Sequence, residues 1–449
     1  MFGLTMLARV CRDTFTATSE AWSRFWFQDM TTVPLEIARI GIGAAILFHY
    51  AMATPFLFDL WGDSGWMPRE VALAYLDNSP WTQSVFFYFT APWQWIAFHT
   101  VFLLGCTAFM LGWRTSWLKW IVLVGQISYD YRNLTLAYGA DSIATCLIFI
   151  LCLAPIGRAM SLDRVRAVRA AKRINLKDTP PAYTSPWACA CTRLVQIQMA
   201  VLFFYSGIEK LKGDEWWSGD AVWLAFATHE FYNNAVLALV ARQYWLVTVG
   251  TYATIVIEIA FPFLIWQRRT RPYLLADAII LHVMFAVLMG LVYFSFIMIM
   301  GHMSFLRPEW LAHLREWWKG KIGDMEMIYD GRCGFCVRSI AWLLAFDGLQ
   351  QITIRDFHTN PSPVVSDAQL EKHLYLVLPD GRALPGFDAY RYVVLRVPGL
   401  WWLVPFFYVP VLSRLFGRPI YNRIAANRSW LSVKGLGGLV TFPQIGAKS

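Results

Sequence analysis

The sequence predicts a polytopic α-helical membrane protein of about eight transmembrane helices, joined to a C-terminal α/β domain. Of the 449 residues, 57% are hydrophobic and 15% are charged, whereas soluble domains average about 25% charged residues. The apolar residues gather in runs of about 20, each long enough to cross a bilayer. The last part of the chain instead shows strand-length and helix-length patterns around a Cys-x-x-Cys pair.

The formal net charge of +9 does not indicate a nucleic-acid-binding protein. The basic residues cluster in short loops between apolar runs, which is the pattern that orients membrane helices. We therefore expect a lipid bilayer as partner and no nucleic acid. Residues 1–30 are predicted to be an amphipathic interfacial segment, because Trp22 and Trp26 occur together with Arg12 and Arg24.

The predicted transmembrane domain covers residues 31–306. Its last apolar run, 273–306, is interpreted as two short spans that meet near Gly290, and one long tilted span is the alternative. The six earlier spans are expected at about 35–58, 92–112, 117–137, 139–157, 190–209 and 243–266.

Basic loops follow the second, fourth and sixth predicted spans, and another basic cluster follows residue 306. The positive-inside rule then places the N-terminus and the C-terminal domain in the cytoplasm of a cell with a bacterial-type inner membrane. A single crossing by 273–306 would instead place the C-terminal domain outside.

After a linker at 307–324, residues 325–430 are predicted to form the α/β domain, and 431–449 a tail. Strands are expected at 325–329 and 351–357, a helix at 334–346, a hairpin around Asp380-Gly381 and a helix from Gly386. Arginines and prolines interrupt the apolar run from Val393 to Phe416, so we interpret it as helices packed on the domain or on the membrane face, not as a ninth span.

Cys333 and Cys336 carry the chemistry that residue types alone indicate. In a strand–turn–helix unit the first cysteine lies at the helix N-terminus, where unpaired N–H groups, the helix dipole and the neighbouring Arg332 favour the thiolate. Cys333 would attack a disulfide, Cys336 would resolve the mixed disulfide, and Asp330 would be a nearby proton acceptor or a cap. Two inert buried cysteines are one alternative.

A zinc site is the other alternative, but it needs a second ligand pair, and only His358 and His373 follow. We therefore assign no metal to this domain.

Three spaced motifs resemble the DCC family (DUF393) of predicted thiol-disulfide oxidoreductases, which are thought to be thioredoxin-like. The resemblance implies a redox-active centre, protein or small thiol and disulfide substrates, and no required cofactor for this domain. One departure is Lys372-His373, where related folds place a cis-proline before the third strand. The motifs are Asp330-Gly331-x-Cys333-x-x-Cys336, Gly386-Phe387-Asp388-Ala389, and Tyr421-Asn422-Arg423-Ile424-Ala425-Ala426-Asn427-Arg428.

Ionisable residues inside apolar runs are candidate sites because burying them in a membrane is costly. Lys210 closes the fifth span and precedes Trp216 and Trp217, while Glu258 and His282 lie in later spans. These groups are predicted to converge on one site with aromatic walls that include Trp223. The alternative is that Lys210 only reaches toward the lipid headgroups.

Residues roughly 30–310 resemble the HTTM domain, the membrane module shared with vitamin K-dependent gamma-carboxylase. The resemblance implies a quinone or hydroquinone as cofactor, and Lys210 matches the lysine implicated there as the base that starts hydroquinone oxidation. The matching residues are Arg132-Asn133, Gly139-x-Asp141, Ser161-Leu162-Asp163, Gly207-Ile208-Glu209-Lys210-Leu211 and His282.

The first functional hypothesis is a membrane-anchored thiol-disulfide oxidoreductase of the protein-disulfide reductase type, acting through Cys333 and Cys336. The second is a carboxylase-like, quinol-oxidising enzyme that acts through Lys210. The third is a transport or scaffold protein whose Cys-x-x-Cys pair senses redox state.

Overall fold

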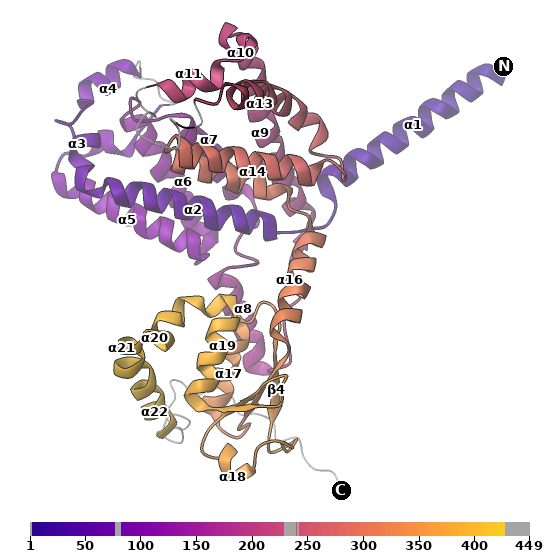
Figure 1. Ribbon diagram of the computed structural model, residues 1–449, viewed down its shortest axis with the longest axis vertical. Coiled ribbons are helices and arrows are strands. Elements are labelled where there is room, and N and C mark those ends of the chain that lie inside the picture. The colour runs from indigo at the N-terminus through magenta and orange to yellow at the C-terminus, as the bar shows by residue number, and fades with distance from the viewer. Residues whose placement is uncertain (1, 77–81, 229–238, 240–241, 427–449) are drawn as a thin grey trace. The chain divides into compact units, whose positions relative to one another are not determined.

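A computed structural model describes residues 2–76, 82–228, 239 and 242–426 (Figure 1). The predicted tail at 431–449 and the end of the third motif, Asn427-Arg428, lie outside the described residues. The chain divides into two compact units. The membrane unit comprises residues 1–164 and 182–308, and the redox unit comprises residues 165–181 and 309–449.

Each predicted span is occupied by a helix. By length and apolar composition, five helices of the described chain could cross a membrane, or six if the bent pair at 398–424 counts as one span. The eight helices in the predicted spans are α2 (Val33–Ala53), α5 (Pro92–Leu111), α6 (Thr115–Arg132), α7 (Gly139–Leu153), α9 (Pro186–Lys210), α13 (Tyr244–Leu264), α14 (Arg271–Leu288) and α15 (Val292–His302).

Short elements complete the membrane unit. The strands β1 (Met30–Thr31) and β2 (Thr184–Ser185) pair antiparallel and join the end of α1 to the start of α9. The remaining elements are α1 (Phe2–Phe27), η1 (Thr54–Phe56), α3 (Leu57–Trp61), α4 (Arg69–Tyr75), η2 (Val85–Tyr88), α10 (Asp214–Ser218), α11 (Ala221–Ala227) and η3 (Met303–Phe305).

The apolar run 273–306 folds as a helical hairpin. Gly290 has a φ of 71°, a left-handed conformation that glycine adopts without a steric penalty. It reverses the chain between α14 and α15, and the His282 ring of α14 lies 5.7 Å from Phe294 and 5.6 Å from His302. The run therefore consists of two packed helices.

Two arginines of the membrane unit, Arg39 and Arg132, are buried and bonded inside the protein. Arg39 does not reach toward the headgroups but is fully buried in a 2.7 Å ion pair with Glu36. Arg132 does not pair with its neighbours Asp130 and Asp141 but donates to the carbonyl oxygen of Gly62 at 2.7 Å. Such buried charges need partners, and backbone carbonyls of other segments supply many of them here.

The redox unit is built on a four-stranded mixed sheet of order β4-β3-β5-β6. Strand β3 (Met325–Tyr329) pairs in parallel with β4 (Ile352–Asp356) and antiparallel with β5 (Tyr375–Val377), which pairs antiparallel with β6 (Ala383–Pro385). With helices after β3 and β6, this is the β-α-β…β-β-α order that the sequence predicts.

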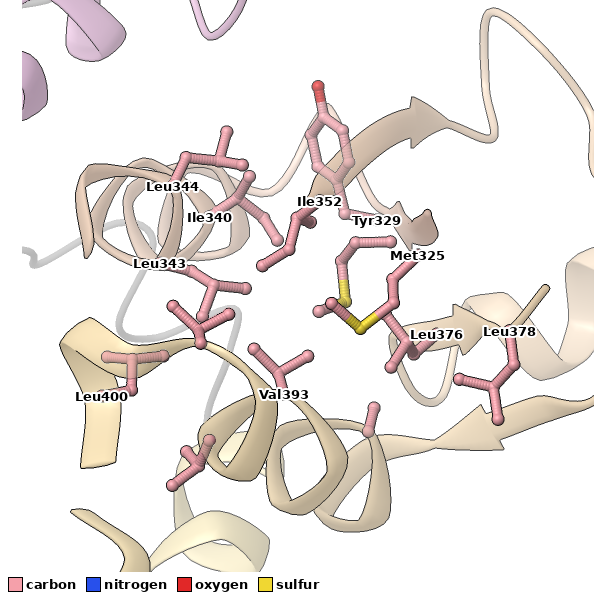
Figure 2. Packing of buried hydrophobic residues seen from close by; sticks show 14 residues of the cluster. Met325, Tyr329, Ile340, Leu343, Leu344, Ile352, Leu376, Leu378, Val393 and Leu400 are labelled. Atoms are coloured by element: carbon pink, nitrogen blue, oxygen red, sulfur yellow. The ribbon is translucent and has the colours of Figure 1, made fainter. Parts of the chain in front are cut away.

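Helices α17 (Gly334–Phe346) and α19 (Gly386–Arg396) cover one face of this sheet. Alternate side chains of β3, such as Met325 and Met327, point to this face as strand geometry requires, and both are fully buried. Figure 2 shows Ile340 and Leu343 of α17 and Val393 of α19 directed at the same core. The opposite face has a smaller core, which α18 (Asp367–Leu370) supplies together with nearby loops.

A segment from between α7 and α9 belongs to the redox unit. Residues 165–181 include most of α8 (Leu162–Ile174). Leu176 packs against the main core of the redox unit, and the Arg169 guanidinium lies 4.0 Å from the ring centre of Trp342. Helix α16 (Pro308–Ile322) occupies most of the predicted linker, and its Ile322 packs on the same core.

The apolar run after α19 forms a bent set of short helices. Its two halves, 398–408 and 410–424, meet at 81°. Phe407 stacks on Phe387 of α19 at 5.1 Å between ring centres, so the set packs on the domain, as one of the predicted arrangements has it. Its elements are η4 (Pro398–Leu403), α20 (Val404–Tyr408), α21 (Pro410–Leu412), η5 (Ser413–Gly417) and α22 (Arg418–Ala426).

Candidate active site

Cys333 is the N-cap residue of α17. Its backbone is extended, with φ −86° and ψ 104°, and its sulfur accepts a hydrogen bond from the backbone N–H of Cys336 at 3.4 Å. The first N–H groups of a helix have no partner within the helix, so an anionic sulfur at this position is stabilised by them and by the helix dipole. The position predicted for Cys333 from the sequence is thus the one observed.

The pKa of the Cys333 thiol is lowered from 9.0 to about 6. The largest cause is a hydrogen bond from the Cys336 side chain, and the backbone N–H groups of Cys336 and Phe335 add to it. Partial burial and the charge of Asp330 oppose the lowering. Arg332, expected to contribute a positive neighbour, is exposed, so hydrogen bonds rather than its charge account for the lowered pKa.

Asp330 directly follows β3 and organises the turn that leads to α17. Its Oδ1 accepts hydrogen bonds from the backbone N–H groups of Arg332 at 2.9 Å and Cys333 at 3.2 Å. These bonds order the turn that precedes α17, and the N-cap of the helix is Cys333 rather than Asp330. His358 Nε2 is 3.0 Å from the same carboxylate oxygen, which brings an imidazole into the site. From the sequence, His358 was expected only as a possible zinc ligand.

Gly331 lets this turn approach the end of β4 closely. Its N–H donates to Asp356 Oδ1 at 3.1 Å. A Cβ atom at this position would lie 2.2 Å from the other carboxylate oxygen of Asp356, closer than real atoms come. The Asp-Gly pair of the first motif is therefore required by the contact between this turn and β4.

Cys336 lines an apolar pocket of about 580 Å³. Aromatic side chains form much of its wall, and they come from α17, α19 and the bent helices that follow. Leu374, which directly precedes β5, completes the side next to the sheet. In this chain a leucine, together with Lys372-His373, therefore occupies the region where related folds carry a proline.

The first and third motifs, far apart in sequence, both line this pocket, and the second motif contacts the third at Tyr421. Tyr390 follows the second motif, Tyr421 opens the third, and their ring centres are 6.0 Å apart. The pKa of Tyr390 is raised by its removal from water and by the nearby Tyr421 and Cys336. A Cβ on Gly386 would lie 2.7 Å from the Tyr421 hydroxyl oxygen. Neither tyrosine was predicted as a site residue, and only Tyr421 belongs to one of the motifs.

Lys210 and Glu258 of the membrane unit come together, as the sequence analysis expected. Lys210 Nζ lies 2.7 Å from Glu258 Oε2 and 2.6 Å from Ser206 Oγ, and it is 5.2 Å from the ring centre of Trp216. The pair is largely buried, with side-chain exposures of 18% and 7%.

Two other residues predicted for that site have different contacts. Trp217 is exposed and donates through Nε1 to the Leu211 carbonyl at 2.9 Å. His282 is bonded to the Ala278 carbonyl at 2.7 Å and lies among aromatic rings and His302. In the described residues the structure thus joins Lys210 to Glu258 and Trp216, and places His282 in a separate aromatic cluster.

Within the described part of the chain, no three or more histidine, cysteine, aspartate or glutamate side chains are grouped as a metal site would need.

Comparisons with known proteins identify both units. A family model of the HTTM domain matches residues 35–310, and a model of the DCC1-like thiol-disulfide oxidoreductases matches residues 327–434. The uncharacterized protein YitO of Bacillus subtilis (strain 168) is 32% identical over 112 residues, or 23% of this chain. The match covers only 35% of that curated relative. No solved structure is significantly similar to the chain.

Alkylation of Cys333 by iodoacetamide should rise with pH around about 6 rather than around 9, because the thiolate reacts and its pKa is lowered. Cys336→Ala should move this midpoint upward, since the Cys336 side chain is the largest cause of the lowering. Arg332→Ala serves as the control and should leave the midpoint in place. Mass spectrometry of the Cys333 peptide measures each profile, and a wild-type midpoint near 9 would contradict the site geometry.

Proposed function

Because this chain belongs to the HTTM family and its C-terminal part is a DCC1-like thiol-disulfide oxidoreductase domain, we propose that it is a membrane-anchored protein-disulfide reductase. Its substrates are disulfides in proteins or small molecules, and its active dithiol is Cys333 and Cys336. The observation that carries the proposal is the Cys333 sulfur at the N-terminus of α17, with its pKa lowered to about 6.

The reaction follows from the two positions. The Cys333 thiolate attacks one sulfur of the substrate disulfide, and the other substrate sulfur leaves as a thiolate. The thiol of Cys336, one helical turn further on, then loses its proton and attacks the Cys333 sulfur. The second substrate thiolate is released and the enzyme holds a disulfide, so two electrons pass to the substrate. Thiols of a reducing compartment would restore the dithiol.

The membrane face on which the redox unit lies can be inferred from the chain segments that make up the unit. Residues 165–181 lie between α7 and α9, and they are part of the redox unit. A soluble unit can include such a loop only if both are on the same membrane face. That loop is the most basic of the chain, so the positive-inside rule assigns this face to the cytoplasm.

Eight crossings are supported by the two points at which the chain enters the redox unit. Helix α9 starts from the loop that contributes to the redox unit, and α16 enters the redox unit again. An even number of crossings must separate them, which α9, α13, α14 and α15 provide. One crossing by 273–306 would make the number odd. The last crossing is short, since its apolar helix runs only from Val292 to Phe305.

Reduction of insulin disulfides by the purified full-length protein in detergent should require Cys333. We expect Cys333→Ser to remove the activity, and Cys336→Ser to accumulate a mixed disulfide with substrate that dithiothreitol releases. Cys146→Ser, which alters an exposed cysteine of α7, is the control and should retain full activity. Insulin reduction that survives Cys333→Ser would refute the proposal. If Cys333 and Cys336 can be oxidised and reduced but the protein does not reduce insulin, a redox sensor would be favoured instead.

A membrane-impermeant thiol reagent should label Cys333 and Cys336 only after cells are lysed, because we place the redox unit in the cytoplasm. An exposed residue of α10, Asp214, provides the control for the opposite face. In a Cys333→Ser/Cys336→Ser background, Asp214→Cys should be labelled in intact cells. Labelling of the native pair in intact cells would reverse the proposed orientation.

A second candidate function concerns the membrane unit, as a site that binds a hydroquinone and accepts its proton. It is favoured by the pairing of Lys210 with Glu258 against Trp216, because buried ionisable groups in membrane domains usually mark functional sites. In the pair as it stands Lys210 is a hydrogen-bond donor, so a hydroquinone would have to displace one of its partners before transferring a proton.

Lys210→Ala should remove any hydroquinone oxidation by the full-length protein in nanodiscs. The substitution removes the amine that would accept the hydroquinone proton. Lys212→Ala is the matched control, since Lys212 forms a similar 2.6 Å ion pair with Glu209 but is exposed. An oxygen-consumption assay with a reduced short-chain quinone measures the rate. Equal rates in both variants would exclude Lys210 from this role.

A further inference from the structure

The pocket beside Cys336 is almost entirely apolar, but it has a few polar groups close to the sulfur. Cys336 is one of its lining residues, and the other polar ones are Ser339 and the tyrosines Tyr329, Tyr390 and Tyr421. The remaining wall is largely aromatic and aliphatic. Pockets that bind small molecules typically combine an apolar wall with a few well-placed polar groups in this way.

This polarity argues against a peptide as the occupant. A peptide segment brings an N–H and a C=O group with nearly every residue, and each costs free energy when it is buried without a partner. One serine and three tyrosine hydroxyls could serve only a few such groups. A compact lipophilic molecule with one or two acceptor oxygens fits the wall better, and about 580 Å³ is within the range of small-molecule sites.

The pocket opens through the bent helices that follow α19. Among its lining residues, Trp402 is 61% exposed, Phe416 48% and Ile420 54%, so the opening lies where these side chains reach the surface. Arg414 and Arg418 are on the same helices. Exposed tryptophan and phenylalanine beside arginine are typical of segments at a membrane interface, so a ligand dissolved in the membrane is the kind that this opening admits.

We propose that this pocket binds a membrane-soluble quinone and that the Cys333/Cys336 dithiol reduces it. The inference rests on the proposed thiol chemistry and names a second, lipophilic substrate for it. The Cys333 thiolate and the Cys336 thiol form one S–S bond, and the quinone takes up their two electrons. The quinone also takes the thiol proton and one proton from water and becomes a hydroquinone. The tyrosine hydroxyls donate hydrogen bonds to the quinone oxygen.

The two sulfurs then serve different substrates. Cys333 lies beside Asp330 and His358, on the polar side of the turn. Cys336 is the cysteine that lines the apolar pocket. A polar disulfide substrate reacts at Cys333, whereas the quinone is held next to Cys336.

The test uses the full-length protein, reduced and then freed of reductant, with decylubiquinone as the probe. We expect loss of quinone absorbance with two thiols consumed for each quinone reduced, and no reaction in Cys333→Ser. Phe416→Glu places a carboxylate on the pocket wall and should slow quinone reduction about tenfold or more, because desolvating a charge there costs at least ~1.4 kcal/mol.

Leu415→Glu is the matched control. Leu415 is the preceding residue, is 64% exposed and does not line the pocket, so the variant adds the same charge and should reduce decylubiquinone at the wild-type rate. Equal rates in Phe416→Glu and wild type would overturn the proposed pocket. A wild-type protein that reduces insulin but not decylubiquinone would overturn the quinone inference and leave the disulfide reductase standing. Failure with both substrates would overturn both.

A binding measurement covers the case in which Phe416→Glu loses both activities. A photoreactive azidoquinone should crosslink wild-type protein at peptides of α17 or α22, and excess decylubiquinone should compete. Crosslinks confined to the membrane unit would overturn the proposed site.

Discussion

The hydrogen bonds that the Cys333 sulfur accepts at the N-terminus of α17 are the interaction on which the proposed thiol chemistry depends. They exist only while α17 keeps its position, and that position is set by packing. Ile340 and Leu343 hold the helix on the sheet through the core of Figure 2. The Asp330 carboxylate fixes the turn from the other side, although its charge disfavours the thiolate. Asp330 therefore holds the turn in place but raises the pKa of Cys333. The hydrogen bonds from the Cys336 side chain and the backbone lower that pKa by more.

The redox unit is not a simple C-terminal appendage, because a segment between two transmembrane helices completes it. Leu176 contributes to its main core, and the buried Lys172 donates to the Leu176 carbonyl at 3.0 Å. Burial and the neighbouring Asp347 act on the Lys172 pKa in opposite directions, and burial, which lowers it, is the larger effect. Both α16 and this segment connect the unit to the membrane helices. Two connections restrict where a soluble domain can move more than one flexible linker would.

Much of this arrangement could be predicted from the sequence, and the failures have physical causes. Apolar runs locate the membrane helices because a bilayer requires about 20 apolar residues, and the Cys333 position follows from a strand–turn–helix pattern. The burial of Arg39 could not be predicted, because its partner Glu36, three residues away, gives no sign in a hydropathy pattern. The tyrosines at the pocket were missed because residues 390 and 421 come together only through folding. His282 was grouped with Lys210 from sequence, but helix packing gives it other neighbours.

The apolar run after α19 shows why composition alone does not determine the role of a hydrophobic segment. Its length suits a membrane span, but prolines at 398, 405 and 410 remove backbone donors and divide it into short helices. Short helices can turn one side to the domain and another outward. Phe407 packs on Phe387, whereas Val411 and Leu415 are exposed. The prolines that divide the segment therefore allow it to enclose a pocket at Cys336 and leave apolar side chains on its opposite side, and on the proposed quinone chemistry this pocket gives the thiol pair an apolar approach that the polar side at Asp330 does not offer.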